Sequence, residues 1–176
     1  MSLFTIGHST HSLDHVVQLL RKNGVTLLLD VRAVPGSRRM PDFAEAHLAT
    51  ELPDRGIGYA HVPELGGRRK ARLDSPNTGW RSASFRGYAD HMQTPEFEAG
   101  LERLLELSRG LVAAMMCAEA VPWRCHRSLI ADALVARGQE VREIIGPGEP
   151  RAHLMTPFVE VDGNCLTYPQ RAASQD

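Results

Sequence analysis

The sequence predicts a single α/β domain in three layers: a mostly parallel sheet of about five strands flanked by helices, with a β-hairpin near the C-terminus. First, short apolar runs alternate with amphipathic segments over residues 3–145, the order typical of parallel strands joined by right-handed helical crossovers. Second, residues 26–31 (TLLLDV) are almost continuously apolar, as in a strand covered on both faces. Third, Asp162-Gly163 lies between two β-rich runs within residues 150–170, which favours a hairpin.

Five short runs bounded by loop residues are expected to form the sheet. They cover residues 3–7, 26–31, 59–65, 111–116 and 140–145.

Helices are expected at residues 13–23, 42–55, 96–107 and 126–137, with another beginning at residue 88. In the first, Val16, Leu19 and Leu20 follow the helical spacing, and Ser12 can cap its start. Pro95 suits a first helical turn. Residues 66–87 form the longest irregular segment, which in a compact domain is usually functional or mobile.

Composition limits the function. A formal net charge of -1 over 176 residues gives no global electrostatic case for binding nucleic acid or an anionic membrane. No apolar run approaches the ~20 residues that span a bilayer, and the first residues do not have the pattern of a signal peptide. Three cysteines do not suggest a disulfide framework, so we expect a reduced, cytoplasmic protein.

Polar and reactive residues follow the ends of the first four predicted strands. Ligands of open α/β sheets bind beyond the carboxyl ends of the strands, so we expect these residues to meet at one edge. The candidates are His8 and Ser9; Asp30, Arg32, Ser37 and Arg38; Glu64, Gly66, Gly67 and Arg68; and Cys117, Glu119, Cys125, His126, Arg127 and Ser128.

Several of these residues lie in ordered motifs that resemble a known family. The motifs are TIGHS (5–9), DVRAVPGSRR (30–39), PELGGRR (63–69), FRGYADHM (85–92), MCAE (116–119) and CHRSLIADAL (125–134). Together they resemble the domain-of-unknown-function family 488. The resemblance implies a compact α/β domain of bacteria and archaea, and it adds Tyr88 to the binding candidates. It supplies no reaction, and the segment after residue 150 lies outside it.

The two cysteines of the fourth strand-to-helix turn are the candidate nucleophiles. A helix N-terminus stabilises thiolates and binds anions. Thiol-dependent phosphatases and sulfurtransferases place five residues between Cys and Arg, whereas six separate Cys117 from Arg124. That departure does not favour a phosphatase mechanism. The structural alternative is a buried Cys117 that ends a core strand.

A metal site is an alternative use of the same turn. Cys117, Glu119, Cys125 and His126 offer four ligands, and His8 a further one if the first and fourth strands are neighbours. We expect the adjacent Cys125 and His126 to point in different directions, and their spacing is not that of usual zinc sites. The sequence therefore predicts no metal and no other cofactor.

The arginines have structural and functional interpretations. Asp30 and Arg32 have two interpretations: they form an ion pair that fixes the loop, or Asp30 acts as a general base or sugar-hydroxyl acceptor while Arg32 and Arg38 hold a phosphate. Arg127, beside an apolar helix face, requires a carboxylate (Asp30 or Glu119) or a bound anion.

The sequence favours a protein that binds or acts on a small phosphorylated or nucleotide-like anion. Its catalytic candidates are Cys117, Glu119, Cys125, His126 and Asp30, and Gly66-Gly67 would let backbone approach the ligand. A non-catalytic nucleotide-binding or nucleic-acid-processing accessory module and a Cys/His metal-binding domain are the alternatives. Nucleic acid is possible but not favoured, no membrane partner is expected, and the oligomeric state and enzymatic status stay open.

Overall fold

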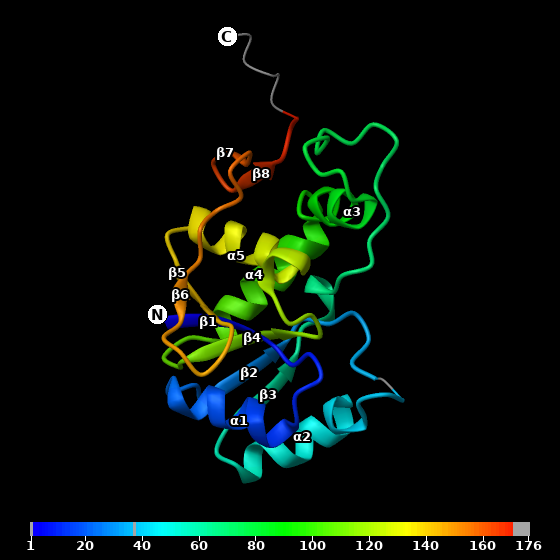
Figure 1. Ribbon diagram of the computed structural model, residues 1–176. Helices are drawn as coiled ribbons and strands as arrows, with labels where there is room; N and C mark the ends of the chain where they lie inside the picture. The colour runs from blue at the N-terminus through cyan, green and yellow to red at the C-terminus, as the bar shows by residue number, and fades with distance from the viewer. Residues whose placement is uncertain (1, 37, 171–176) are drawn as a thin grey trace.

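The protein, seen as a computed structural model, is described for residues 2–36 and 38–170. These residues form a six-stranded sheet, five α-helices and a separate two-stranded hairpin (Figure 1). The sheet strands are β1 (Ser2–Gly7), β2 (Leu27–Asp30), β3 (Gly58–His61), β4 (Ala113–Cys117), β5 (Glu140–Ile144) and β6 (Arg151–Ala152), and the hairpin strands are β7 (Glu160–Asp162) and β8 (Cys165–Thr167). The helices are α1 (Leu13–Lys22), α2 (Glu45–Asp54), α3 (Ala83–His91), α4 (Pro95–Leu107) and α5 (Arg127–Ala136).

The sheet confirms the predicted fold class. Its strand order is β3-β2-β4-β1-β5-β6, and all pairs are parallel except β5 with β6. The sequence does not predict β6, because two residues are too few to form a pattern. The hairpin is also confirmed, and Gly163 takes the positive φ of 59° that its turn requires.

Helices cover both faces of the sheet, α1 and α2 on one and α4 and α5 on the other (Figure 1). Consecutive strand residues divide between the two resulting cores. Leu28 packs with α1 and α2, and Leu29 packs with α4 and α5. This two-sided burial accounts for the nearly continuous apolar run of β2, because neither face of the strand meets water.

Two predicted boundaries differ from the structure by four or more residues. The third strand ends at His61 rather than near residue 65, and Pro63–Leu65 forms a 3₁₀ turn. Proline has no N–H to extend a ladder, and its fixed φ suits the start of a helical turn. Helix α3 starts at Ala83, which shortens the irregular segment to residues 66–82.

The C-terminal segment is fastened to α5 by a buried carboxylate. Asp132 accepts hydrogen bonds from His153, Thr156 and Tyr168. The backbone N–H of Tyr168 also donates to the side chain of Asn77, so residues 150–168 hold both α5 and the long irregular segment. No helix in the described ranges has the length and apolar character needed to cross a membrane.

Candidate functional site

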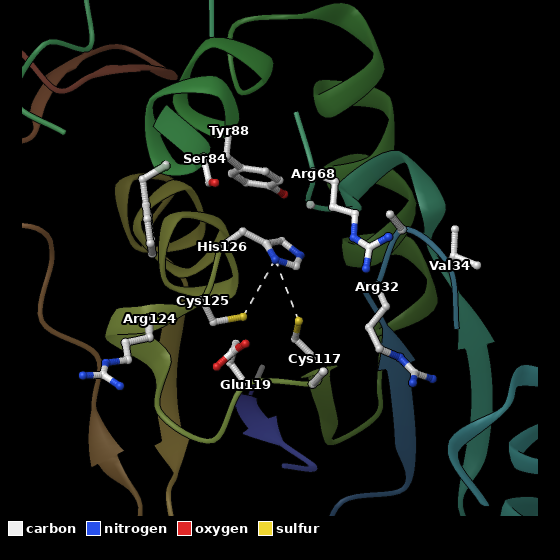
Figure 2. A pocket seen from close by; sticks show the side chains of 14 residues that line it. Arg32, Val34, Arg68, Ser84, Tyr88, Cys117, Glu119, Arg124, Cys125 and His126 are labelled. Carbon is white, nitrogen blue, oxygen red and sulfur yellow. Dashed lines mark hydrogen bonds between the residues drawn. The ribbon is translucent and has the colours of Figure 1, made fainter. Parts of the chain in front are cut away.

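A cavity of about 340 Å³ lies beyond the carboxyl ends of β2 and β4, bordered by the start of α5 and by α3 (Figure 2). Cys117 is the last residue of β4, and Cys125 and His126 immediately precede α5. The predicted site residues that line this cavity are Arg32, Gly67, Arg68, Tyr88, Cys117, Glu119, Cys125 and His126.

Cys117, Cys125 and His126 form a compact group, here called the Cys-Cys-His cluster. The Nδ1 atom of His126 lies 3.8 Å from the sulfur of Cys117 and 3.8 Å from the sulfur of Cys125 (Figure 2). The two sulfurs and one ring nitrogen all lie within 4.8 Å of one another. Both thiols are buried, so these atoms meet largely out of water.

The second ring nitrogen fixes the tautomer of His126. Nε2 lies 2.8 Å from the carbonyl oxygen of Val31, which can only accept a hydrogen bond. Nε2 therefore carries a proton, so that in the neutral ring the lone pair is on Nδ1, the atom that faces the two sulfurs. The imidazole is thereby held in one orientation by a residue at the end of β2.

The prediction that Cys125 and His126 point in different directions is wrong. Cys125 has extended backbone angles (φ -134°, ψ 142°), whereas His126 is already helical (φ -57°, ψ -19°). The chain turns between the two residues and brings both side chains into the cavity. His126 makes no capping hydrogen bond, and Ser128 instead donates to the carbonyl of Cys125.

The two thiols have opposite pKa shifts. The pKa of Cys117 is lowered, mainly because the thiol of Cys125 donates a hydrogen bond that stabilises the Cys117 thiolate. The pKa of Cys125 is raised well above its usual range by that same hydrogen bond and by burial. Cys117 is thus the thiol that loses its proton first.

Arg127 supports the turn that carries the cluster and does not line the cavity. Its guanidinium donates to the backbone carbonyls of Glu119, at 2.6 Å, and Ala120, at 3.0 Å. The sequence predicts a carboxylate or an anion as the partner of Arg127, and this prediction is wrong. The side chain reaches back from the first turn of α5 to the loop after β4, where it meets these carbonyls instead. A methyl group on Gly7 would lie 1.7 Å from the same Glu119 oxygen, so this packing requires glycine.

Asp30 and Arg32 form a buried ion pair. Asp30 is fully buried and accepts from Arg32 Nε at 2.8 Å and from Arg32 Nη2 at 2.5 Å. The Tyr59 hydroxyl donates to the same carboxylate at 2.8 Å. Asp30 does not line the cavity. The geometry of the pair is therefore that of the first interpretation, an ion pair that fixes the loop after the strand.

Two arginines at the cavity have guanidinium groups without a protein partner among the described residues. Arg68 has a positive φ of 64° and reaches into the cavity opposite Cys125, whereas the Arg124 side chain projects away from His126 (Figure 2). Arg68 is therefore the uncompensated positive charge closest to the interior of the cavity.

The remaining predicted residues do not line the cavity. His8 stacks on Phe43 with ring centroids 4.2 Å apart and does not join the Cys-Cys-His cluster, even though β1 and β4 are neighbours. Glu64 pairs with Arg103 near the surface. Ser9, Arg38, Gly66 and Ser128 also lie outside the lining, and Ser37 falls outside the described residues.

Sequence reasoning missed the contribution of the first turn of α3. Ser84 and Phe85 line the cavity together with Tyr88. Phe85 and Tyr88 are three residues apart, so they share a helix face, but this spacing lies at the end of a segment that reads as irregular. The helix can pack closely there because Gly87 has no side chain. A methyl group on Gly87 would lie 2.2 Å from the carbonyl oxygen of Arg69.

Residues 12–134 match the family described as Domain of unknown function DUF488. The chain belongs to this family. The match confirms the resemblance. It includes every residue that lines the cavity, but it does not include the TIGHS motif before residue 12. No curated protein and no solved structure matched the chain.

Proposed function

We propose that this DUF488 protein binds a small anion of the phosphate or nucleotide type in the cavity and acts on it with the Cys-Cys-His cluster. One observation carries the proposal: two sulfurs and an imidazole nitrogen converge at a cavity into which the unpaired guanidinium of Arg68 reaches. Reactive groups and an uncompensated positive charge in one small cavity are typical of a ligand site.

The charges support an anionic ligand. The charge of Arg32 is compensated by Asp30, so Arg68 is left to attract a ligand oxygen. A guanidinium binds phosphate or carboxylate through two parallel hydrogen bonds. Glu119 also lines the cavity and offers a carboxylate for proton transfer near the cluster.

The size and walls of the cavity support a small ligand. Its volume of about 340 Å³ is near the lower end of the range for small-molecule sites. Phe85 and Tyr88 supply aromatic surface, which suits a ring such as a nucleobase. The net charge of -1 gives no support for an extended nucleic-acid track.

Titration calorimetry with inorganic phosphate and with ADP tests the proposal. Saturable binding is expected, and Arg68→Ala should weaken it about 10- to 100-fold, because a charge-assisted hydrogen bond contributes roughly 1.5 to 3 kcal/mol. The matched control is Arg109→Ala, which removes an exposed arginine outside the cavity. The proposal fails if neither ligand binds, or if Arg68→Ala binds as tightly as the unchanged protein.

Hydrolysis of phosphate esters separates catalysis from binding. In a Cys165→Ser background, Cys117→Ser should abolish turnover of a phosphate-ester panel while calorimetric binding of phosphate persists. Turnover that survives this change would exclude a role for Cys117 in the chemistry. Binding with no turnover in the unchanged protein would favour the non-catalytic accessory module.

A further inference from the structure

We infer that Cys117, Cys125 and His126 are the protein ligands of a transition-metal site of the zinc class, whose fourth coordination position faces the cavity. This inference deepens the proposed function. The role of the ion rests on that function, whereas the binding of the ion does not depend on it.

The distances within the cluster fit such an ion. A tetrahedral zinc ion with Zn–S bonds of ~2.3 Å and a Zn–N bond of ~2.0 Å holds sulfur and nitrogen about 3.5 Å apart. Nδ1 of His126 lies 3.8 Å from each sulfur, so both separations need to change by only about 0.3 Å.

The orientation of His126 is that of a metal ligand. Ligating histidines usually donate their second N–H to a carboxylate or backbone carbonyl, which fixes the ring and its tautomer. Here Nε2 donates to the carbonyl of Val31 at 2.8 Å, and Nδ1, which has the lone pair in the neutral ring, faces both sulfurs. The imidazole is therefore already in the orientation that coordination requires.

Gly67 keeps the space beside Nδ1 clear. A methyl group at this position would lie 2.9 Å from Nδ1, closer than a Cβ is normally found. The loop after the 3₁₀ turn at Pro63–Leu65 thus passes His126 without covering its free nitrogen.

The ligand set also indicates the kind of site. Two thiolates and one imidazole suit zinc, and they balance the two charges of the ion. Within the described ranges, no fourth Cys, His, Asp or Glu joins the group within 4.8 Å, although Glu119 lines the same cavity. Three protein ligands with an open position are typical of catalytic sites, whereas structural zinc sites have four. The ligands come from the end of a strand and the start of a helix, so their spacing in the sequence differs from that of usual zinc sites.

Cobalt provides a direct test, because Co²⁺ takes the place of zinc and reports its ligands by absorption. Chelator-treated, reduced protein is titrated with Co²⁺ and then with Zn²⁺. We expect one Co²⁺ per chain, a sulfur-to-cobalt charge-transfer band, the visible bands of a tetrahedral ion, and displacement by zinc. Cys117→Ser and Cys125→Ser should weaken binding at least about 100-fold, since loss of a second-shell partner alone costs 10- to 100-fold. Cys165→Ser is the matched control, because Cys165 is an exposed free cysteine in β8 outside the cluster.

A second measurement needs no change in the cluster. In Cys165→Ser, two thiols are left, and zinc should slow their alkylation by iodoacetamide more than about tenfold relative to chelator-treated protein. The inference is overturned if Co²⁺ does not bind saturably, if its spectrum lacks the sulfur band, or if zinc leaves alkylation unchanged. Phosphate titrations with and without zinc keep the two proposals apart. Metal binding without phosphate binding leaves the metal site standing and refutes the anion function, and the reverse result refutes the metal site alone.

Discussion

The guanidinium of Arg127 donates a 2.6 Å hydrogen bond to the backbone carbonyl of Glu119, across the turn that separates the two cluster cysteines. Arg127 is only 1% exposed, and its Nη2 atom also donates to the carbonyl of Ala120. This arginine belongs to the scaffold of the site. It sets the path of the chain between Cys117 and Cys125 and thereby their separation.

Arg127→Ala should lower the free energy of unfolding by about 2 to 4 kcal/mol, because two carbonyls lose their buried donors and a cavity is left. Urea denaturation followed by circular dichroism measures the change. Arg109→Ala, which removes an exposed arginine, should change stability by less than about 0.5 kcal/mol. Equal stability of the two variants would show that the Arg127 hydrogen bonds contribute little.

Gly67→Ala should weaken Co²⁺ binding about tenfold or more while leaving the fold intact, because the added methyl group lies 2.9 Å from Nδ1 of His126. The cobalt titration described above measures the affinity. Gly146→Ala is the matched control, since a methyl group there has no neighbour within 4 Å. Unchanged cobalt affinity in Gly67→Ala would mean that the ion does not approach Nδ1.

His153 should make stability depend on pH in the alkaline range. Burial opposes the charge of its ring, but hydrogen bonds to Asp132 at 2.7 Å and Glu143 at 2.8 Å outweigh burial and raise the pKa of His153 to about 9. The unfolded value is about 6.5. Because the folded pKa is the higher one, the stabilisation is fully present below pH ~6.5 and is lost as the pH rises through about 9.

Urea denaturation between about pH 6 and pH 10 measures this dependence, with up to about 3 kcal/mol expected to be lost from the free energy of unfolding. His153→Gln should be less stable at the acidic end and should show a flatter profile, because the titrating group is gone. A His153→Gln profile that parallels the unchanged protein would assign the alkaline loss to other groups.

Much of the sheet could be predicted because its signals are local. The run Leu27–Asp30 is apolar because both faces of the strand are covered, and Asp162-Gly163 forms its turn through its own backbone preferences. The two-residue strand Arg151–Ala152 has no such signal, since it depends only on pairing with β5. The early start of α3 was missed for a similar reason: no side-chain cap or clear apolar stripe marks residue 83.

Side-chain direction at the sheet edge was not predictable to the same degree. Cys117 and Glu119 do face the cavity, as expected of residues at and just beyond the end of a parallel strand. Asp30 ends the neighbouring strand β2 but is turned away, because Arg32 and Tyr59 saturate its carboxylate beneath the surface. Residues at one edge therefore divide between the scaffold and the cavity according to partners that sequence spacing does not reveal.

By itself, the sequence determined that strands and helices alternate, and that thiols, an imidazole and guanidiniums follow the strand ends. Periodicity and turn chemistry are properties of short segments, so one chain read in order contains them. Only the tertiary structure decided that His126 and Cys125 face the same way and that Arg127 faces the scaffold. The His126 ring is oriented by a carbonyl 95 residues earlier in the chain, and only folding brings such distant groups within hydrogen-bonding distance.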